Sequence, residues 1–125
     1  MKFVLLDAAS VELIHEQIIQ PNELQGRSAD QSLDSTIARV NNRLAYGLIL
    51  DVFDLATAYA AAISQGLCFL DANRRTAFQA MDVILDLNGI RIDWCIEEVG
   101  DRVIDLAQCR LDEAQFASWL RTLVD

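Results

Sequence analysis

Two arginines follow two polar residues in the segment Asp71-Ala72-Asn73-Arg74-Arg75-Thr76, where a helix is predicted to begin near Asn73. The first turn of a helix leaves backbone N–H groups unpaired and carries the positive end of the helix dipole, so it attracts anions. The guanidinium groups of Arg74 and Arg75 suit bidentate binding of phosphate. The segment therefore predicts a phosphate site at the start of this helix.

Asp71 and Asn73 fit the same chemistry. Asp71 can hold a metal or orient a nucleophile, and Mg²⁺ needs only one or two carboxylates when phosphate oxygens complete its shell. An ordinary structural explanation stays open, because Asp and Asn are common helix caps and surface arginines are usually solvated. The dipole weighs against that explanation, since cations at a helix N-terminus are unfavourable without an anion.

The composition limits the class of protein. The chain has 125 residues, of which 53% are hydrophobic, and this is enough for one domain, residues 1–125, around a single core. Ten basic residues against nineteen acidic ones give a net charge of −9, which disfavours direct nucleic-acid binding. The acidity suits a basic or mixed-charge protein partner, or serves solubility alone.

The cysteines and the apolar runs indicate the compartment. Cys68, Cys95 and Cys109 are odd in number and match no zinc or disulfide spacing, so we expect reduced, mostly buried thiols. The apolar run near the N-terminus is too short for a signal peptide, and no stretch approaches the ~20 apolar residues of a membrane span. We expect a soluble cytoplasmic protein that does not contact membranes.

Helical periodicity predicts an all-α fold that positions the motif. Residues 3–6 are expected to be a strand or an extended arm, and Gly66 a left-handed residue that ends the third helix before a loop over 67–72. The expected helices are one from the N-cap Ser10 to Pro21, then 33–44, 51–65, 73–88, one around 99–107, and a last one N-capped by Asp112.

The segment from Gly66 to Ala77 resembles the signature of the Fic/Doc family, His-x-Phe-x-Asp-Gly/Ala-Asn-Lys/Arg-Arg-Thr. Residues 40–46 and 54–59 and the Asn88-Gly89 turn are also similar to that family, and His15 matches a histidine common in the first helix of Doc-like members. The resemblance spans nearly the whole chain and implies a compact Fic/Doc helical bundle. The matching signature residues are Phe69, Asp71, Ala72, Asn73, Arg74, Arg75 and Thr76.

The resemblance favours the Doc (death-on-curing) branch. AMP-transferring members usually have glycine where this chain has Ala72 and Arg74, and those glycines let the backbone wrap the phosphates. The Doc type implies transfer of phosphate from ATP or another nucleotide triphosphate, with Mg²⁺, to a hydroxyl of a translation elongation factor; AMP transfer is the less favoured alternative. It implies catalytic positions at 67, Asp71 and Arg75, a nucleotide site at Phe69, Asn73, Arg74 and Arg75, and a metal at Asp71.

The resemblance also implies a partner. Doc-type members are toxins neutralised by an antitoxin whose C-terminal helix fills a groove near the site. The internal inhibitory pattern of some relatives, Ser/Thr-x-x-x-Glu, is absent, because no Ser or Thr here has Glu four residues later. Inhibition is therefore expected from another chain.

Leu67 departs from the family, because the catalytic histidine that acts as general base aligns with it. Leucine accepts no proton, and loss of a general base costs roughly 10²–10⁴-fold in rate. The chain is either an inactivated toxin or a natural pseudoenzyme that keeps the pocket for antitoxin binding or regulation. Cys68 and Gln65 also depart from common family choices, which favours a natural degenerate member.

The remaining polar and aromatic residues have ordinary explanations. His15 is interpreted as a surface or hydrogen-bonded packing residue, and Cys68 as an inert thiol rather than a redox site. Trp94 and Trp119 are expected in the core rather than in a partner groove. Four aspartates at helical spacing form a solvated acidic face rather than a metal site: Asp82, Asp86, Asp101 and Asp105.

Overall fold

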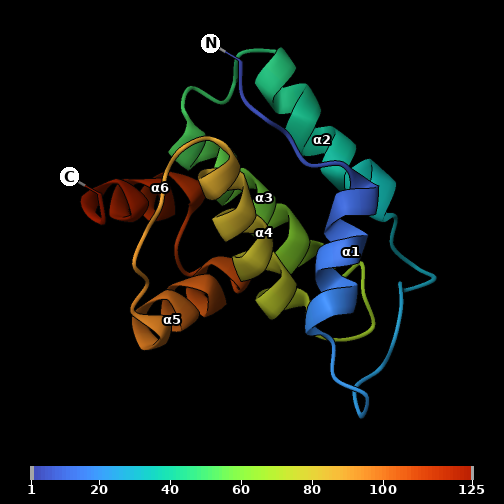
Figure 1. Cartoon of the computed structure of the whole chain (residues 1–125). Coiled ribbons are helices and arrows are strands. Elements are labelled where there is room, and N and C mark those ends of the chain that lie inside the picture. The colour runs from blue at the N-terminus through green and yellow to red at the C-terminus, as the bar shows by residue number, and fades with distance from the viewer. Residues whose placement is uncertain (1, 125) are drawn as a thin grey trace.

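The computed structural model describes residues 2–124 and confirms the all-α prediction. Six helices account for the regular structure of this part of the chain (Figure 1). No helix within residues 2–124 combines the length and apolar character needed to cross a membrane. The helices are α1 (Ala8–Ile18), α2 (Leu33–Ala45), α3 (Val52–Gly66), α4 (Asn73–Leu87), α5 (Ile96–Ala107) and α6 (Glu113–Thr122).

Helix α3 is the centre of the bundle, with α4 packed most closely against it (Figure 1). It also contacts α2, α5 and α6, so nearly all of its surface is buried. Ala56, Ala58 and Ala60 are fully buried, and their small side chains allow neighbouring helices to approach closely. The predicted inward face, Val52, Leu55, Tyr59 and Ile63, is buried as expected.

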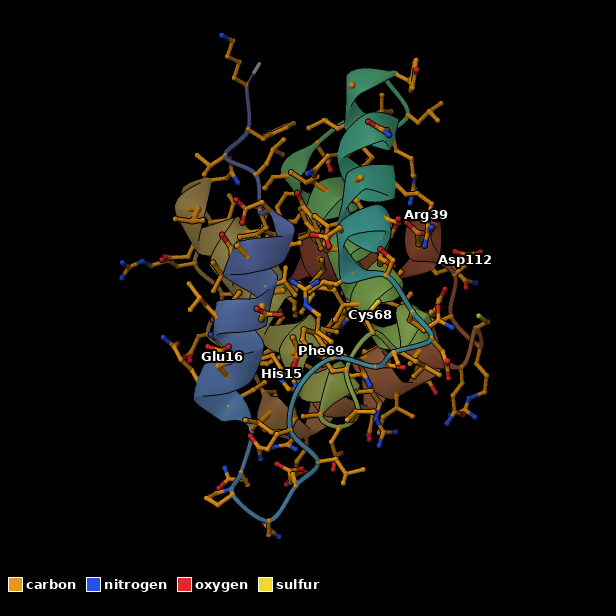
Figure 2. The ribbon with its side chains drawn as sticks, turned by 90° about the vertical axis from the view of Figure 1, so that its right-hand side faces the viewer. His15, Glu16, Arg39, Cys68, Phe69 and Asp112 are labelled. Atoms are coloured by element: carbon orange, nitrogen blue, oxygen red, sulfur yellow. The ribbon has the colours of Figure 1, made fainter. Side chains whose placement is uncertain are left out.

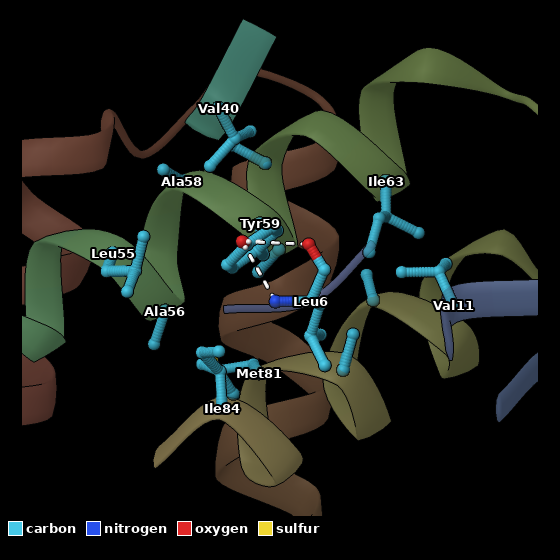
Figure 3. Close-up of a cluster of buried hydrophobic side chains, with 14 of the residues drawn as sticks. Leu6, Val11, Val40, Leu55, Ala56, Ala58, Tyr59, Ile63, Met81 and Ile84 are labelled. Atoms are coloured by element: carbon cyan, nitrogen blue, oxygen red, sulfur yellow. Dashed lines mark hydrogen bonds between the residues drawn. The ribbon is translucent and has the colours of Figure 1, made fainter. Parts of the chain in front are cut away.

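The N-terminal arm is extended and is held to α3 by Tyr59 (Figure 3). The backbone N–H of Leu6 donates to the Tyr59 hydroxyl at 3.2 Å, and the hydroxyl lies 3.3 Å from the Leu6 carbonyl. Asn41 of α2 donates to the same carbonyl at 3.2 Å and also accepts from the hydroxyl. Burial raises the pKa of Tyr59 above its ordinary value.

Two expectations about the surface of the bundle are wrong. Asp7, not Ser10, caps α1, and its carboxylate accepts from the Ser10 backbone N–H at 2.8 Å and from the Ser10 hydroxyl at 2.7 Å. Only Cys68 is buried among the cysteines, because Cys95 precedes the first turn of α5 and Cys109 follows the last turn of α5.

The prediction that Asp112 caps α6 is confirmed, with a full capping box.

An aromatic cluster attaches α5 and α6 to α4. Trp119 is nearly buried, meets Phe116 edge-on at 5.4 Å and lies 6.4 Å from Trp94. The indole of Trp94 donates to Asp82 at 2.9 Å and meets the ring of Phe78 edge-on. Both tryptophans are therefore part of the packed interior or its edge, as expected from the sequence, and they fix the helices behind the motif.

Candidate functional site

The motif loop, residues 67–72, joins α3 to α4 and pairs with a distant segment of the chain. Phe69 forms an antiparallel bridge with Arg27, which lies between α1 and α2. The backbone N–H of Ser28 donates to the Cys68 carbonyl at 2.8 Å, and that of Leu70 donates to the Gly26 carbonyl at 3.1 Å. These bonds hold residues 68–70 beside the 26–28 segment.

The residue that turns the chain out of α3 is Leu67, not Gly66. Gly66 is still helical, while Leu67 has φ 51° and ψ 41°, in the left-handed region. Close packing explains the glycine, because a Cβ at Gly66 would stand 3.4 Å from both Cys68 Sγ and Thr36 Cγ2. A leucine in the left-handed region is strained, and its side chain is 59% exposed, so neither backbone nor core packing favours it.

The N-terminus of α4 is left open by its own residues. The N-cap is Ala72, in the left-handed region with φ 62°, and no side chain caps this helix. Asn73 instead turns back onto the loop, accepting from the Phe69 N–H at 3.1 Å and donating to the Phe69 carbonyl at 2.9 Å. The first N–H bonded in the helical pattern is that of Thr76, so the donors of the preceding turn are available to an anion.

His15 of α1 packs against the loop beside Phe69 (Figure 2). Its ring is 1% exposed and stacks on Phe69 with centroids 3.9 Å apart and planes 5° apart. Its Nε2 lies 2.9 Å from the Asp71 carbonyl oxygen, and because a carbonyl only accepts, Nε2 donates. The interpretation of His15 as a packing histidine is confirmed for the buried, hydrogen-bonded form, and the surface alternative is wrong.

The Asp71 carboxylate lies at the edge of the same turn. One oxygen accepts from the Ala72 backbone N–H at 2.9 Å, and the other lies 3.4 Å from the N–H of Leu24. The second contact is long, so this oxygen keeps most of its capacity for a cation or a hydroxyl. Within residues 2–124 no group of three or more His, Cys, Asp or Glu side chains could hold a metal ion.

The two arginines of the motif differ in their contacts. The Arg75 guanidinium forms an ion pair with Glu23 of the α1–α2 loop and lies 3.5 Å from the Ile18 carbonyl. Glu23 is further fixed by the Gln20 backbone N–H, which donates to it at 2.9 Å. Arg74 is exposed and has no carboxylate partner among the described residues. One guanidinium is thus already paired with an anion, and the other faces solvent.

These residues line one open pocket of about 660 Å³ at the N-terminus of α4. The size falls in the range of small-molecule sites. The structure brings Leu67, Asp71, Asn73, Arg74 and Arg75 to its wall, while Phe69 is buried beneath the loop against His15. Ala72 of the signature also lines the pocket, and residues that the sequence reasoning missed complete the lining: Glu23, Ser64, Leu70, Ala107 and Gln108.

Comparison with known proteins agrees with this geometry. The sequence model of the Fic/DOC family matches residues 5–85, which include α1 to α3, the motif loop and all but the last two residues of α4. The chain belongs to the Fic/DOC family. It is 32% identical over 100 residues to a protein named protein kinase doc from Escherichia phage P1, covering 80% of this chain and 79% of that protein. The chain is a Doc-type member of the family.

The histidine of the first helix does not reach the pocket and so does not replace the base that the family has at position 67. His15 is the single histidine of the chain. It is buried, its Nε2 donates to the Asp71 carbonyl, and it is not among the residues that line the pocket. The imidazole is therefore not positioned to take a proton from a group bound in the pocket.

Proposed function

We propose that this chain is a Doc-like toxin domain that binds a nucleotide triphosphate with Mg²⁺ at the start of α4, with transfer of the terminal phosphate to a protein hydroxyl impaired by Leu67. The observation that carries the proposal is the uncapped N-terminus of α4, with Arg74 and Arg75 on the wall of one pocket. Relatedness to a protein named as a kinase supports phosphate transfer over AMP transfer. A translation elongation factor is the proposed acceptor.

The phosphates would be held by three kinds of donor. Backbone N–H groups of the first turn of α4 supply a fixed partial positive charge. Arg74 supplies a free guanidinium, and Arg75 becomes available once Glu23 moves away. Bidentate contacts from arginine are among the stronger hydrogen bonds to phosphate.

Asp71 fits a role as the protein ligand of Mg²⁺. Its second carboxylate oxygen has only one long contact, so lone pairs remain for a hard cation. Mg²⁺ commonly takes one carboxylate together with phosphate oxygens and water, which agrees with the lack of a larger acidic cluster in residues 2–124. When bound, Mg²⁺ supplies positive charge to the phosphate oxygens.

The transfer step requires that the acceptor oxygen attack the γ-phosphorus while its bond to the bridging oxygen breaks and the nucleotide diphosphate leaves. The proton of the hydroxyl must go to a base near position 67. Leu67 offers none, so we expect a rate loss of roughly 10²–10⁴-fold. Substrate positioning by Arg74, Arg75 and α4 is unaffected.

The deciding experiment compares the natural chain with Leu67→His. Calorimetric titration of ATP with Mg²⁺ is expected to show binding by both forms. Incubation with a purified elongation factor and ATP labelled at the γ-phosphate is expected to label the factor only with Leu67→His. Label delivered from the α-phosphate instead would make AMP transfer the reaction.

Two arginine variants control the experiment. Arg75→Ala removes a phosphate contact and is expected to weaken ATP binding about tenfold or more. Arg91→Ala, beyond the other end of α4, is paired with Asp86 and should leave ATP binding unchanged. Absence of ATP binding in both the natural and the Leu67→His forms would refute the nucleotide proposal.

A second function is favoured by an apolar groove between α4 and α5. This groove, about 260 Å³, is lined by Phe78, Ile96, Val99 and Val103 with Arg74 and Arg75 at its rim. It suits the apolar face of an antitoxin helix with an acidic flank, because aromatic and aliphatic side chains anchor such helices. A catalytically dead domain could act through this groove alone.

A small upstream gene that encodes a DNA-binding, partly disordered protein would support the antitoxin role, and its product is then the partner to test. Ile96 is 69% exposed, so Ile96→Asp should preserve the fold and prevent co-purification of that product. Leu13→Asp, an equally exposed leucine position on α1, is the matched control. Co-purification unchanged by Ile96→Asp would exclude the α4–α5 groove as the antitoxin site.

A further inference from the structure

A second groove meets the pocket at the start of α4 at Leu67. It measures about 480 Å³ and lies over α2, the C-terminal half of α3 and the start of α6. Among the described residues, Leu67 is the only side chain that lines both this groove and the pocket at the start of α4. The polar side chains that line the groove are Gln31, Thr36, Arg39, Arg43, Gln65 and Glu113.

The geometry of phosphate transfer assigns different occupants to the two hollows. The attacking and leaving oxygens lie roughly in line across the phosphorus, so the acceptor approaches from the side opposite the nucleotide diphosphate. If the pocket at the start of α4 holds the phosphates, as proposed above, the acceptor needs a second approach that reaches this pocket, and Leu67 is the position where another groove joins it. The second groove opens at that position.

Arg39 gives this groove an unmatched positive charge. The side chain is exposed and donates only to the Thr36 hydroxyl, at 3.3 Å. Arg43, in the same groove, is already paired with Glu113 at 3.0 Å. The chain has nineteen acidic residues, yet no described carboxylate pairs with Arg39. A guanidinium left free in a groove is complementary to an incoming carboxylate.

From these contacts we infer that the second groove docks the acceptor segment of the protein substrate, an extended peptide with a Ser or Thr hydroxyl placed at Leu67 and a carboxylate a few residues away placed at Arg39. This inference rests on the proposed phosphate transfer. The net charge of −9 favours basic peptides over the whole surface, so a preference for acidic ones must come from a local site.

The test uses three fluorescein-labelled peptides with a central threonine, identical except for flanking glutamates, lysines or glutamines. Fluorescence anisotropy with the natural chain is expected to show the glutamate peptide binding roughly tenfold more tightly than the lysine peptide. Arg39→Glu should reverse this order, and Arg39→Gln should abolish it. Arg91→Glu, an equally exposed arginine beyond the far end of α4, should leave it unchanged.

Equal binding of all three peptides, or an acidic preference that survives Arg39→Glu, would overturn the inference. In the Leu67→His form with labelled ATP, the glutamate peptide should be labelled fastest at its threonine. There the threonine oxygen bonds to the γ-phosphorus, ADP leaves, and the proton passes to the introduced imidazole. Labelling at one rate for all three peptides would likewise contradict the assignment.

Nucleotide affinity separates this inference from the proposed function. Arg39→Glu should leave the Kd for ATP with Mg²⁺ unchanged, whereas Arg75→Ala should raise it. If both variants raise that Kd alike, the second groove belongs to the nucleotide, and the docking inference fails while the nucleotide proposal stands. If no form binds ATP but the Arg39-dependent preference persists, phosphate transfer fails and the groove stands as a peptide site.

Discussion

The imidazole of His15 lies flat against the ring of Phe69 and donates from Nε2 to the carbonyl oxygen of Asp71. One residue of α1 therefore holds two residues of the motif loop, and both contacts are shielded from water because His15 and Phe69 are buried. The Asp71 carboxylate at the pocket owes its position in part to a residue more than fifty positions earlier in the chain.

Variants of His15 separate the two contacts. His15→Phe retains the stack but leaves the Asp71 carbonyl without its donor, and we expect a loss of about 1–3 kcal/mol in the free energy of unfolding. His15→Ala loses the stack as well and creates a cavity, with an expected loss of about 3–5 kcal/mol. Urea denaturation measures both. Equal losses would mean that the stack contributes nothing.

The sequence predicted the parts of this site that depend on local chemistry. The start of α4 at Asn73 follows from turn residues and helical periodicity, which act over a few positions. The pair of Arg75 with Glu23 and the bond from His15 to Asp71 were not predictable, because each joins residues more than fifty positions apart. Only the packing of α1 and its loop against α4 brings them together.

The left-handed residue at the end of α3 is Leu67 rather than the predicted Gly66, and this shows a second limit of prediction from sequence. Glycine is the usual left-handed residue at a helix end, so the sequence favoured Gly66. In the structure Gly66 stays helical, a Cβ there would stand 3.4 Å from Thr36 and Cys68, and the left-handed position falls at Leu67. The usual preference of glycine for the left-handed position therefore does not decide the end of α3, and the contacts of Gly66 with Thr36 and Cys68 could not be predicted from helical periodicity.

Leu67 therefore gives a stability prediction of its own. Leu67→Gly should not destabilise the protein and is expected to raise the free energy of unfolding by up to about 1 kcal/mol, because it removes left-handed strain at an exposed side chain.

The matched control for this change is Leu70→Gly in the same loop. Leu70 is 51% exposed and does not have a positive φ, so glycine there should cost about 0.5–1 kcal/mol through added freedom of the unfolded chain. Denaturant midpoints compare the two. A loss at Leu67 as large as that at Leu70 would argue against strain at position 67.

Tyr59 predicts how stability depends on alkaline pH. Burial raises the pKa of Tyr59, so the folded state favours the neutral hydroxyl more than the unfolded state does. The resulting stability is complete below the ordinary tyrosine pKa of about 10 and is lost as pH rises through the higher folded value. The free energy of unfolding should fall over this range.

Phenylalanine variants test whether the loss of stability at alkaline pH comes from the Tyr59 hydroxyl. Tyr59→Phe should lower stability at neutral pH by about 1–3 kcal/mol, because the Leu6 backbone loses a partner, and should flatten the alkaline decline. Tyr46→Phe is the control, since Tyr46 is 81% exposed and should keep the decline of the natural chain. A decline of the same slope in both variants would point to another titrating group.

Glu23 gives the last prediction, because its carboxylate occupies the Arg75 guanidinium that a phosphate needs. Glu23→Gln removes both the competitor and a negative charge from the pocket, so ATP with Mg²⁺ should bind about fivefold more tightly, equivalent to about 1 kcal/mol. Glu16→Gln, an exposed change on α1, controls for net charge and should shift the affinity far less. Calorimetry at low and high salt should show the gain from Glu23→Gln shrinking as ions screen the pocket. Weaker ATP binding by Glu23→Gln would instead mean that Glu23 orients Arg75 toward the phosphate.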